Sequence, residues 1–560
     1  MNPAKKALKT SILSVLVVFS ILISSSRAQR LNNWPDMILY NGQVLTMDDG
    51  FRTVGALALR NDQIQAVGSS SEILKLSGSN TRQIDLKGKT VIPGFTDSHF
   101  HLLSSGLAFQ QLQLTSANNI AELVDIIAQA AQDTPKGNWI VASRNWTLGQ
   151  LEENRLPTRQ ELDQATTEQS VWVPRGGHRG VANSLALQLA GLTTISQAPS
   201  GGEIGKDENG ELTGFLLGTA QNPIRKIIPQ PTHQDRLQSI IAMQNRLNAA
   251  GITSVILGAA FPDEIKLLQE IREAGKLTLR ITARMRVRTV EGYDAIKAMP
   301  RSGFGDSWLK IGAIKMGIDG GSDGNMFTEP YVNRPDFYGI QATPTETLRQ
   351  VVLEGNRQGW NFSFHCNGDR AFDVLLPILE EANEEKVITG RRWTIEHGRY
   401  PRSDHIQSLK SLGVLFSVQA NPYWLSSVHI AGFGLQRASY GNPLRQLIDS
   451  GIQVASGSDH GIYFPPLLHM YVYVTRQTRD SGILGIEHAI SAQEALSLVT
   501  KNPPYLTFEE SIKGTIESGK LADLAILSSS PLEVSPSAIK DIEVVATLVG
   551  GQVVSGNLEE

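Results

Sequence analysis

A short stretch near position 100 carries side chains that could bind a metal ion. After an apolar strand pattern and a Pro-Gly pair, Asp97, His99 and His101 occupy alternating positions. Side chains of a strand point to the same face at every second residue, so the two histidines would lie side by side. Neutral imidazole is a common ligand of zinc and similar ions. The His-x-His pair therefore predicts half of a metal site, whose other ligands must come from elsewhere in the chain.

Further metal-capable side chains stand at the ends of other apolar segments. They are Lys315 with Asp319, His365, the pair Glu396 and His397, and Asp459. Histidine is scarce, with 11 in 560 residues, yet four of them, His99, His101, His365 and His397, stand at or near the ends of candidate strands. We therefore predict that these segments bring their ends together around one metal centre.

The elements that would position these groups follow a βα pattern. Short apolar segments alternate with helical patterns, which is typical of a parallel sheet covered by helices. A (β/α)8 barrel requires eight strands, and the candidates are Thr90–His101, Ile252–Leu257, Thr278–Val287, Leu309–Asp319, Asn361–Cys366, Trp393–His397, Val414–Ala420 and Gln453–Asp459. Catalytic groups of such barrels lie at the carboxyl ends of the strands, where the candidate ligands occur.

The two ends of the chain show a different pattern. Short strand patterns with turn signals fill residues 29–90 and return in residues 506–560. They predict a small β-sandwich built from both chain ends, with the barrel in residues 91–505. Residues 103 to about 250 are too long for one crossover and would form a lobe inserted after the first strand. The predicted fold class is therefore α/β: a (β/α)8 TIM-like barrel with an inserted lobe and a β-sandwich.

Residues 1–28 resemble a secretory signal peptide. Three lysines precede a short apolar run, and small residues end it where a peptidase could cut. The prediction is a secreted or periplasmic protein, with an uncleaved membrane anchor as the alternative and no membrane span once the leader is removed. The formal charge is −4, and the leader contributes only cations, so the remaining chain is more acidic, which argues against a nucleic-acid partner. The single Cys366 excludes an internal disulfide.

Six motifs link the chain to a known family. They are Pro93-Gly-Phe-Thr-Asp-Ser-His-Phe-His101, Lys315-Met-Gly-Ile-Asp-Gly320, His365-Cys-Asn-Gly-Asp-Arg-Ala371, Ile395-Glu-His397, Gly457-Ser-Asp459 and Gly519-Lys-Leu-Ala-Asp523. With these motifs the chain resembles the metal-dependent amidohydrolase superfamily, and within it the YtcJ-like branch, amidohydrolase family 3. The resemblance runs from about Asp36 to the C-terminus.

The resemblance implies a ligand set and a reaction. The implied ligands of zinc or another divalent transition metal, as one or two ions, are His99, His101, His365, His397 and Asp459, with Lys315 as a carboxylated lysine that bridges. An ordinary salt bridge with Asp319 or Asp323 is the alternative for Lys315. The implied activity is hydrolysis of non-peptide carbon–nitrogen bonds in a small-molecule substrate, such as an amide, formamide or cyclic amide. Asp459 would act as general base and then as general acid.

Several residues are candidates for the substrate pocket. His178 resembles a pocket residue of the branch but could be a loop histidine, and Arg175 could bind a substrate carboxylate or lie on the surface. Asn421 and Trp424 follow the seventh strand, at the end suited to substrate contact, although packing under a loop explains them equally. Asp369 would orient a metal ligand. A homodimer is implied by the resemblance alone.

The chain also departs from the branch pattern near the expected pocket. Gly398-Arg399 follows His397 where the branch commonly has Ala-Gln, Gly218 stands where an acid is usual, and Ile256-Leu257 replaces polar residues. These departures leave the substrate open. Two alternatives for the function therefore remain: the same site could hydrolyse esters, lactones or phosphotriesters, or the chain could be a catalytically inactive scaffold on the amidohydrolase fold.

Overall fold

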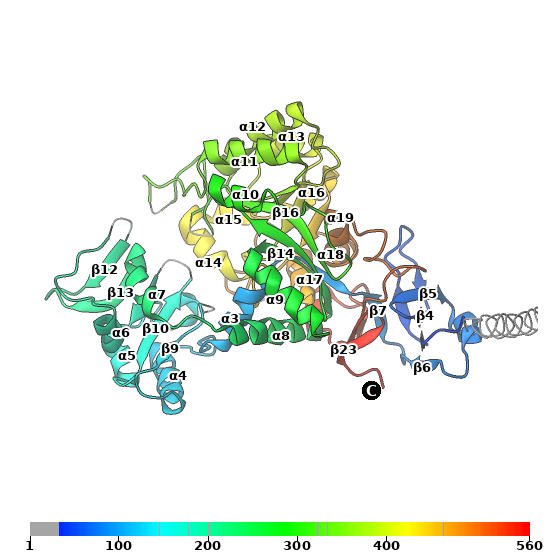
Figure 1. Cartoon of the computed structure of the whole chain (residues 1–560), viewed down its shortest axis with the longest axis horizontal. Coiled ribbons are helices and arrows are strands. Elements are labelled where there is room, and N and C mark those ends of the chain that lie inside the picture. The colour runs from blue at the N-terminus through cyan, green and yellow to red at the C-terminus, as the bar shows by residue number, and fades with distance from the viewer. Residues whose placement is uncertain are drawn as a thin grey trace, which may run out of the picture.

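The computed structural model describes residues 33–559, except 145, 177, 178, 200, 201, 322, 323, 333 and 463. Residues 1–28, the expected signal peptide, lie outside the described residues, and so does His178. The described chain forms a central barrel, a lobe on one side and a β-sandwich on the other (Figure 1). No helix in this part of the chain has both the length and the apolar character needed to span a membrane.

The barrel is the central element, and in the described part of the chain it contains eight parallel strands. In chain order they are β8 Phe95–Phe100, β14 Ile252–Ala260, β15 Arg280–Arg286, β16 Leu309–Gly317, β17 Phe362–Cys366, β18 Thr394–His397, β19 Leu415–Val418 and β20 Val454–Ser456. Each strand pairs with the next in sequence. The order closes on itself where the amide of Asp459 donates to the carbonyl of His99, at 2.7 Å. The predicted (β/α)8 TIM-like barrel is confirmed.

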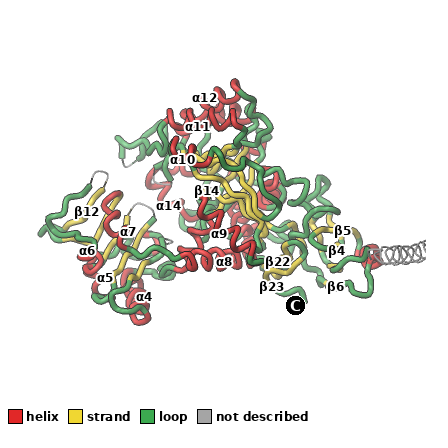
Figure 2. The backbone as a smooth tube through the Cα atoms, in the orientation of Figure 1, coloured by secondary structure: helices red, strands yellow, loops and turns green. Residues whose placement is uncertain are grey.

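Helices between the strands and after the last one cover the barrel, as the red segments around the yellow strands of Figure 2 show. They include α9 Pro262–Glu273, α10 Val290–Ile296, α11 Thr345–Gln358, α12 Asp369–Glu385, α13 Ser403–Ser411, α14 Pro422–Phe433, α15 Leu435–Tyr440, α16 Leu444–Asp449, α17 Pro466–Thr475, α18 Ala492–Val499 and α19 Asn502–Leu506. Because these helices shield the outer face of each strand, the strands are buried on both faces, and β14 is buried almost throughout. Gly359, with φ of 91°, ends α11 in the left-handed conformation that glycine adopts without strain.

The first predicted strand is in fact two strands in different sheets. β7 Thr90–Pro93 pairs with β2 Gln43–Leu45 and β21 Leu524–Leu527 of the sandwich, whereas β8 begins the barrel. Gly94 separates them, and a Cβ there would lie 2.3 Å from the side chain of Thr253. The prediction of one strand over Thr90–His101 is therefore wrong, because the chain changes sheet at a glycine that packs directly against β14.

The sandwich is made from both chain ends. Among the described residues, one sheet has the order β5 Gln63–Gly68, β4 Ala56–Arg60, β1 Met37–Tyr40 and β6 Arg82–Asp85. The other has the order β23 Gln552–Gly556, β22 Val544–Val549, β21 Leu524–Leu527, β7, β2 Gln43–Leu45 and β3 Thr53–Val54. Leu39 and Leu57 of the first sheet share a core with Val91 and Leu524 of the second. The blue and red segments of Figure 1 therefore lie together.

The lobe follows the first barrel strand and α3 Leu102–Gln110. Its sheet has the order β12 Gly202–Lys206, β13 Leu212–Gly218, β11 Arg179–Ala182, β10 Ser170–Arg175 and β9 Trp139–Val141, with α4 Ile120–Asp133, α5 Arg159–Ala165, α6 Ser184–Leu189 and α7 Asn222–Ile227. The chain returns to the barrel through α8 His233–Ala249, which starts at a capping box of Thr232 and Asp235. Arg246 of α8 packs its guanidinium 4.0 Å above the ring of Phe109 in α3. The lobe is thereby attached next to the strand that carries His99.

Candidate functional site

The candidate ligands converge at the carboxyl ends of the barrel strands. The ring centroid of His397 lies 4.9 Å from that of His99 and 4.3 Å from that of His365. His101 lies 5.2 Å from His99 by the same measure. Residues from β8, β17 and β18 therefore form one cluster, at the end of the barrel where this fold places its chemistry.

Asp459 joins this cluster from the loop after β20. Its Oδ1 lies 3.2 Å from Nε2 of His99 and 3.3 Å from Nε2 of His101. The ligand atoms of these three residues all lie within 4.8 Å of one another, which is close enough for them to bind one metal ion. His99, Glu396 and His397 form a second group with the same spacing.

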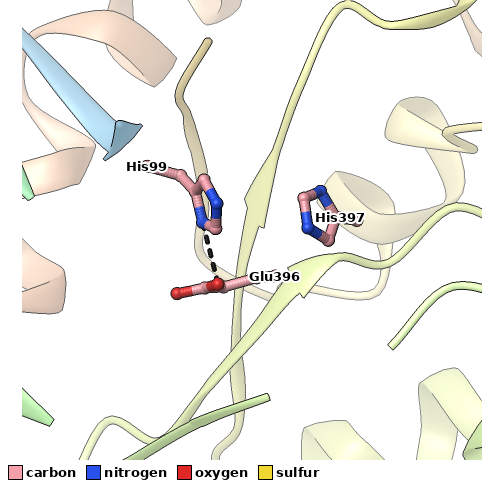
Figure 3. Close-up of side chains that lie close together, drawn as sticks. All are labelled: His99, Glu396 and His397. Carbon is pink, nitrogen blue, oxygen red and sulfur yellow. Dashed lines mark ion pairs between the residues drawn. The ribbon is translucent and has the colours of Figure 1, made fainter. Parts of the chain in front are cut away.

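Glu396, which stands next to His397 at a strand end, belongs to this second group but not to the ligand set that the family resemblance implies. Its carboxylate is fully buried, and Oε2 lies 2.8 Å from Nδ1 of His99. Figure 3 shows this contact, with the ring of His397 beside the two side chains. The other carboxylate oxygen contacts Arg284 and accepts a hydrogen bond from Ser363. The carboxylate of Glu396 thus faces Nδ1 of His99, while Nε2 of the same ring faces Asp459.

Lys315 reaches the same carboxylate. Its Nζ contacts Oε2 of Glu396, and its side chain is almost fully buried. The expected alternative partner Asp319 is instead hydrogen-bonded to backbone amides, and Asp323 lies outside the described residues. Burial, together with Arg284 and Arg286 nearby, lowers the pKa of Lys315 well below its usual range. If Lys315 forms only an ion pair, its partner is therefore Glu396 and not Asp319.

Two residues of the cluster have an unusual backbone conformation. His397 has φ of 72° and Asp459 has φ of 73°, in the left-handed region that costs a non-glycine residue about 1 to 2 kcal/mol. The turn at His397 lets it and its neighbour Glu396 both approach His99, although adjacent residues of a regular strand point in opposite directions. Such conformations concentrate at functional sites, where the surrounding structure holds them in place.

Two buried aspartates hold the loops that carry the ligands. Oδ1 of Asp97 accepts from the amide of His99 at 3.0 Å, and it also accepts from the amide of Ser458, next to Asp459. Asp319 accepts from the amides of Asn367 and Gly368, at 3.0 and 2.9 Å, and so fixes the turn after His365.

Asp369, which the sequence predicts to orient a metal ligand, has its contacts elsewhere in the structure. Its carboxylate accepts from the amide and hydroxyl of Thr328 and lies near Arg402. The amide side chain that contacts a ligand belongs to Asn367, whose Nδ2 lies 2.9 Å from Nε2 of His365. Alternation along a strand could have indicated Asn367, because it stands two positions after His365.

The electrostatics of the cluster suit a cation. Burial lowers the pKa of His99 to about 4 and that of His365 to about 3, and it lowers the pKa of His397 well below the usual value. Burial raises the pKa of Asp459, but contacts with His101 and His99 outweigh it and lower the pKa well below its usual range. Neutral imidazoles and an ionised carboxylate are the ligand forms that a divalent transition metal requires. The residues present therefore fit such an ion.

A cavity of about 540 Å³ opens directly on this cluster. His365, His397 and Asp459 form part of its wall. Arg175, Asn421 and Trp424, the expected pocket residues that the structure describes, also line it. The lobe contributes Trp146 in addition to Arg175, so the cavity lies between the lobe and the barrel. Its volume suits a small organic molecule.

Comparisons with known proteins agree with this geometry. Residues 82–555 match the model of the family described as "Amidohydrolase family". The N-substituted formamide deformylase of Arthrobacter pascens is 26% identical over 92% of this chain and 97% of its own length, and the amidohydrolase YtcJ of Bacillus subtilis is 27% identical over 92% and 99%.

A solved structure also matches. The crystal structure of an uncharacterized metal-dependent hydrolase from Pyrococcus furiosus has a TM-score of 0.71 and 27% identity, and the match covers 89% of this chain and all of the other. The family match covers most of the chain, and the similar structure has the same barrel. The chain therefore belongs to the amidohydrolase family of metal-dependent hydrolases, as the resemblance of its motifs predicted.

Proposed function

We propose that the protein is an exported metal-dependent hydrolase of non-peptide carbon–nitrogen bonds in amides, formamides or cyclic amides. The observation that carries this proposal is the convergence of four histidines and Asp459 in one cluster, of which His365, His397 and Asp459 line a cavity of small-molecule size. The similarity to a formamide deformylase over nearly the whole chain supports the bond type. Export rests on the leader pattern of residues 1–28.

The metal would be zinc or another divalent transition metal, as one or two ions. The ligands would be His99, His101, His365, His397 and Asp459, with Lys315 as a further one if its amine adds carbon dioxide and releases a proton. When bound, such an ion supplies Lewis-acid chemistry, because it polarises a carbonyl group and lowers the pKa of a water molecule toward neutrality. The lowered pKa of Lys315 supports carboxylation, since only the neutral amine reacts with carbon dioxide.

Asp459 would transfer the proton in this reaction. It lines the cavity, and its low pKa keeps it ionised and able to accept a proton. It would take a proton from the attacking water and later deliver it to the leaving nitrogen, as a general base and then a general acid. His99 and His101, whose Nε2 atoms lie 3.2 and 3.3 Å from Asp459 Oδ1, would hold the same ion as this carboxylate.

The test is hydrolysis of matched amides, formamides and esters by purified, metal-loaded protein, together with an Asp459→Asn variant. We expect amide or formamide hydrolysis, and in the variant retained metal with a loss of turnover of about 10²- to 10⁴-fold. A preference for esters, lactones or phosphotriesters would instead support the first alternative. Protein that purifies without stoichiometric metal and hydrolyses none of these compounds would support an inactive scaffold.

A further inference from the structure

The cavity next to the metal cluster has an unequal distribution of charge. Arg144, Arg175 and Arg399 line it, while Asp459 is the only acidic side chain among the described residues of its wall. Asp459 already faces the imidazoles of His99 and His101. A cation bound at the histidine cluster would make the cavity more positive still. A ligand that enters this space is therefore favoured if it carries negative charge.

The three arginines come from separate parts of the fold. β9 and β10 are parallel neighbours in the lobe, and Arg175 ends β10 while Arg144 follows β9, so both leave the sheet at the same edge. Arg399 comes from the barrel, two residues after His397. The lobe and the barrel thus each place arginine side chains at the cavity that they share. The packing within either unit alone does not require an arginine at these positions.

The backbone of Arg399 is fixed beside the metal cluster. Gly398, with φ of 54°, turns the chain, and a Cβ there would lie 2.5 Å from the ring of Phe416. The carbonyl of Arg399 accepts a hydrogen bond from the amide of Asn442 at 2.9 Å, and Arg399 as a whole is only 4% exposed. A guanidinium is a planar fork of donors that binds a carboxylate through two parallel hydrogen bonds. This position is also where the sequence departs from the Ala-Gln common in the branch.

The remaining wall is partly aromatic. Trp146 is buried, and its indole nitrogen donates to the carbonyl of Pro174 at 2.9 Å, so its ring has a fixed orientation. Trp424 lines the cavity from the start of α14 and is also buried. Indole rings provide flat apolar surfaces against which an aromatic or branched apolar group can pack. The cavity therefore offers cationic and apolar surface together, next to the predicted reaction centre.

We propose that the substrate is an amide that carries a carboxylate and an apolar side group, as an N-acyl derivative of an apolar amino acid does. Arg399 binds the carboxylate, Arg175 and Arg144 provide the surrounding positive field, and Trp146 and Trp424 contact the apolar group. This inference rests on the proposed amide hydrolysis for its reaction, but the recognition of the carboxylate is a property of the pocket and can be measured separately.

The experiment compares N-acetyl-phenylalanine with N-acetyl-phenethylamine, which differ only in the carboxylate. Binding to the metal-loaded protein is measured by calorimetry, and hydrolysis is followed by release of the free amine. We expect the carboxylate compound to bind about 10- to 100-fold more tightly, since a hydrogen bond to a charged group contributes about 1.5 to 3 kcal/mol. Arg399→Gln should reduce this preference at least tenfold, with the loss in hydrolysis appearing mainly in KM.

Two further variants test whether the carboxylate preference depends on the guanidinium of Arg399. Arg399→Lys keeps the charge but not the fork and should restore only part of the preference. Arg357→Gln removes an exposed arginine that pairs with Glu385 on the outer helices and should leave the preference unchanged. Equal binding of the two compounds to the unaltered protein, or a preference that survives Arg399→Gln, would overturn the proposal.

The same measurements separate this inference from the proposed function. If neither compound is hydrolysed but the carboxylate preference is present and lost in Arg399→Gln, the pocket assignment stands and amide hydrolysis fails. If both compounds are hydrolysed with equal kcat/KM and bind equally, hydrolysis stands and the carboxylate assignment fails.

Discussion

Glu396 Oε2 lies 2.8 Å from Nδ1 of His99, so a fully buried carboxylate from β18 holds a histidine from β8 across the barrel. The opposite ring nitrogen of His99 faces Asp459 at 3.2 Å. Carboxylate partners of this kind fix the tautomer of a metal-binding histidine and increase its basicity. Glu396 also contacts Lys315 and Arg284, so one carboxylate organises both a ligand and the cations behind it.

The first prediction concerns this carboxylate. Glu396→Gln should lower the affinity for zinc about 10- to 100-fold, because the amide keeps the shape but loses the charge that orients His99. Affinity is measured by competition with a chelator of known strength, and circular dichroism checks the fold. Glu385→Gln, which alters an exposed pair with Arg357, serves as the control. An unchanged zinc affinity in Glu396→Gln would show that His99 does not depend on this contact.

Lys315 gives a second prediction, which separates its two possible roles. If a carboxylated Lys315 holds metal, Lys315→Ala should lose metal, and added formate or acetate should restore part of it by supplying the missing carboxylate. If Lys315 is only the cation that balances Glu396, an anion cannot replace it, and no rescue occurs. The measurement is zinc content against acetate concentration. Lys310→Ala, which removes a lysine paired with Glu509, is the control and should retain its metal.

The third prediction tests the tight packing around His99. A Cβ at Gly258 of β14 would lie 2.5 Å from Nε2 of His99, closer than any side chain tolerates. Gly258→Ala should therefore displace the imidazole and reduce metal content more than it reduces thermal stability. Gly149→Ala is the matched control, because no atom lies within 4 Å of a Cβ at that position. Full metal content in Gly258→Ala would mean that the His99 ring can move without leaving the site.

The fourth prediction concerns stability and pH. Glu264 is 7% exposed, and burial raises its pKa to about 7 from the usual 4.5, against the hydrogen bond from the amide of Leu103 and the charge of Arg236. The folded state thus binds this proton more tightly than the unfolded state. The contribution to stability is complete below pH 4.5 and is lost as the pH rises toward 7, by about 3 kcal/mol.

Glu264→Gln removes this dependence while it keeps the acceptor for Leu103. The difference in unfolding free energy between the variant and the original protein should grow in favour of the variant from pH 4.5 to 7. Urea denaturation across that range measures it, and Glu273→Gln on the same helix corrects for the loss of one exposed charge. A constant difference across the range would contradict the raised pKa.

The sequence predicted much of the fold because the βα pattern and the strand-end ligands are local signals. Each of the eight expected barrel segments overlaps an observed strand, and the cluster of His99, His101, His365 and His397 follows from strand ends meeting in a closed barrel. The break at Gly94 could not be predicted, since Thr253, the residue that requires it, is contributed by another strand.

The partners of the ligands were harder to predict than the ligands themselves. Adjacent residues of a regular strand point to opposite faces, and the left-handed backbone of His397 lets Glu396 and His397 both approach His99. Asp319, rather than Asp369, supports the turn after His365, and this choice depends on how β16 and β17 align. Contacts across a barrel depend on the register of paired strands, which a single sequence does not encode locally.

The central claim is that side chains from four strand ends hold a divalent metal, and an anomalous-difference map from crystals of the zinc-loaded protein tests it most directly. We expect one or two strong peaks among His99, His101, His365, His397 and Asp459, and a branched density on Lys315 if it is carboxylated. An active, zinc-containing crystal with no peak among these residues would contradict the account.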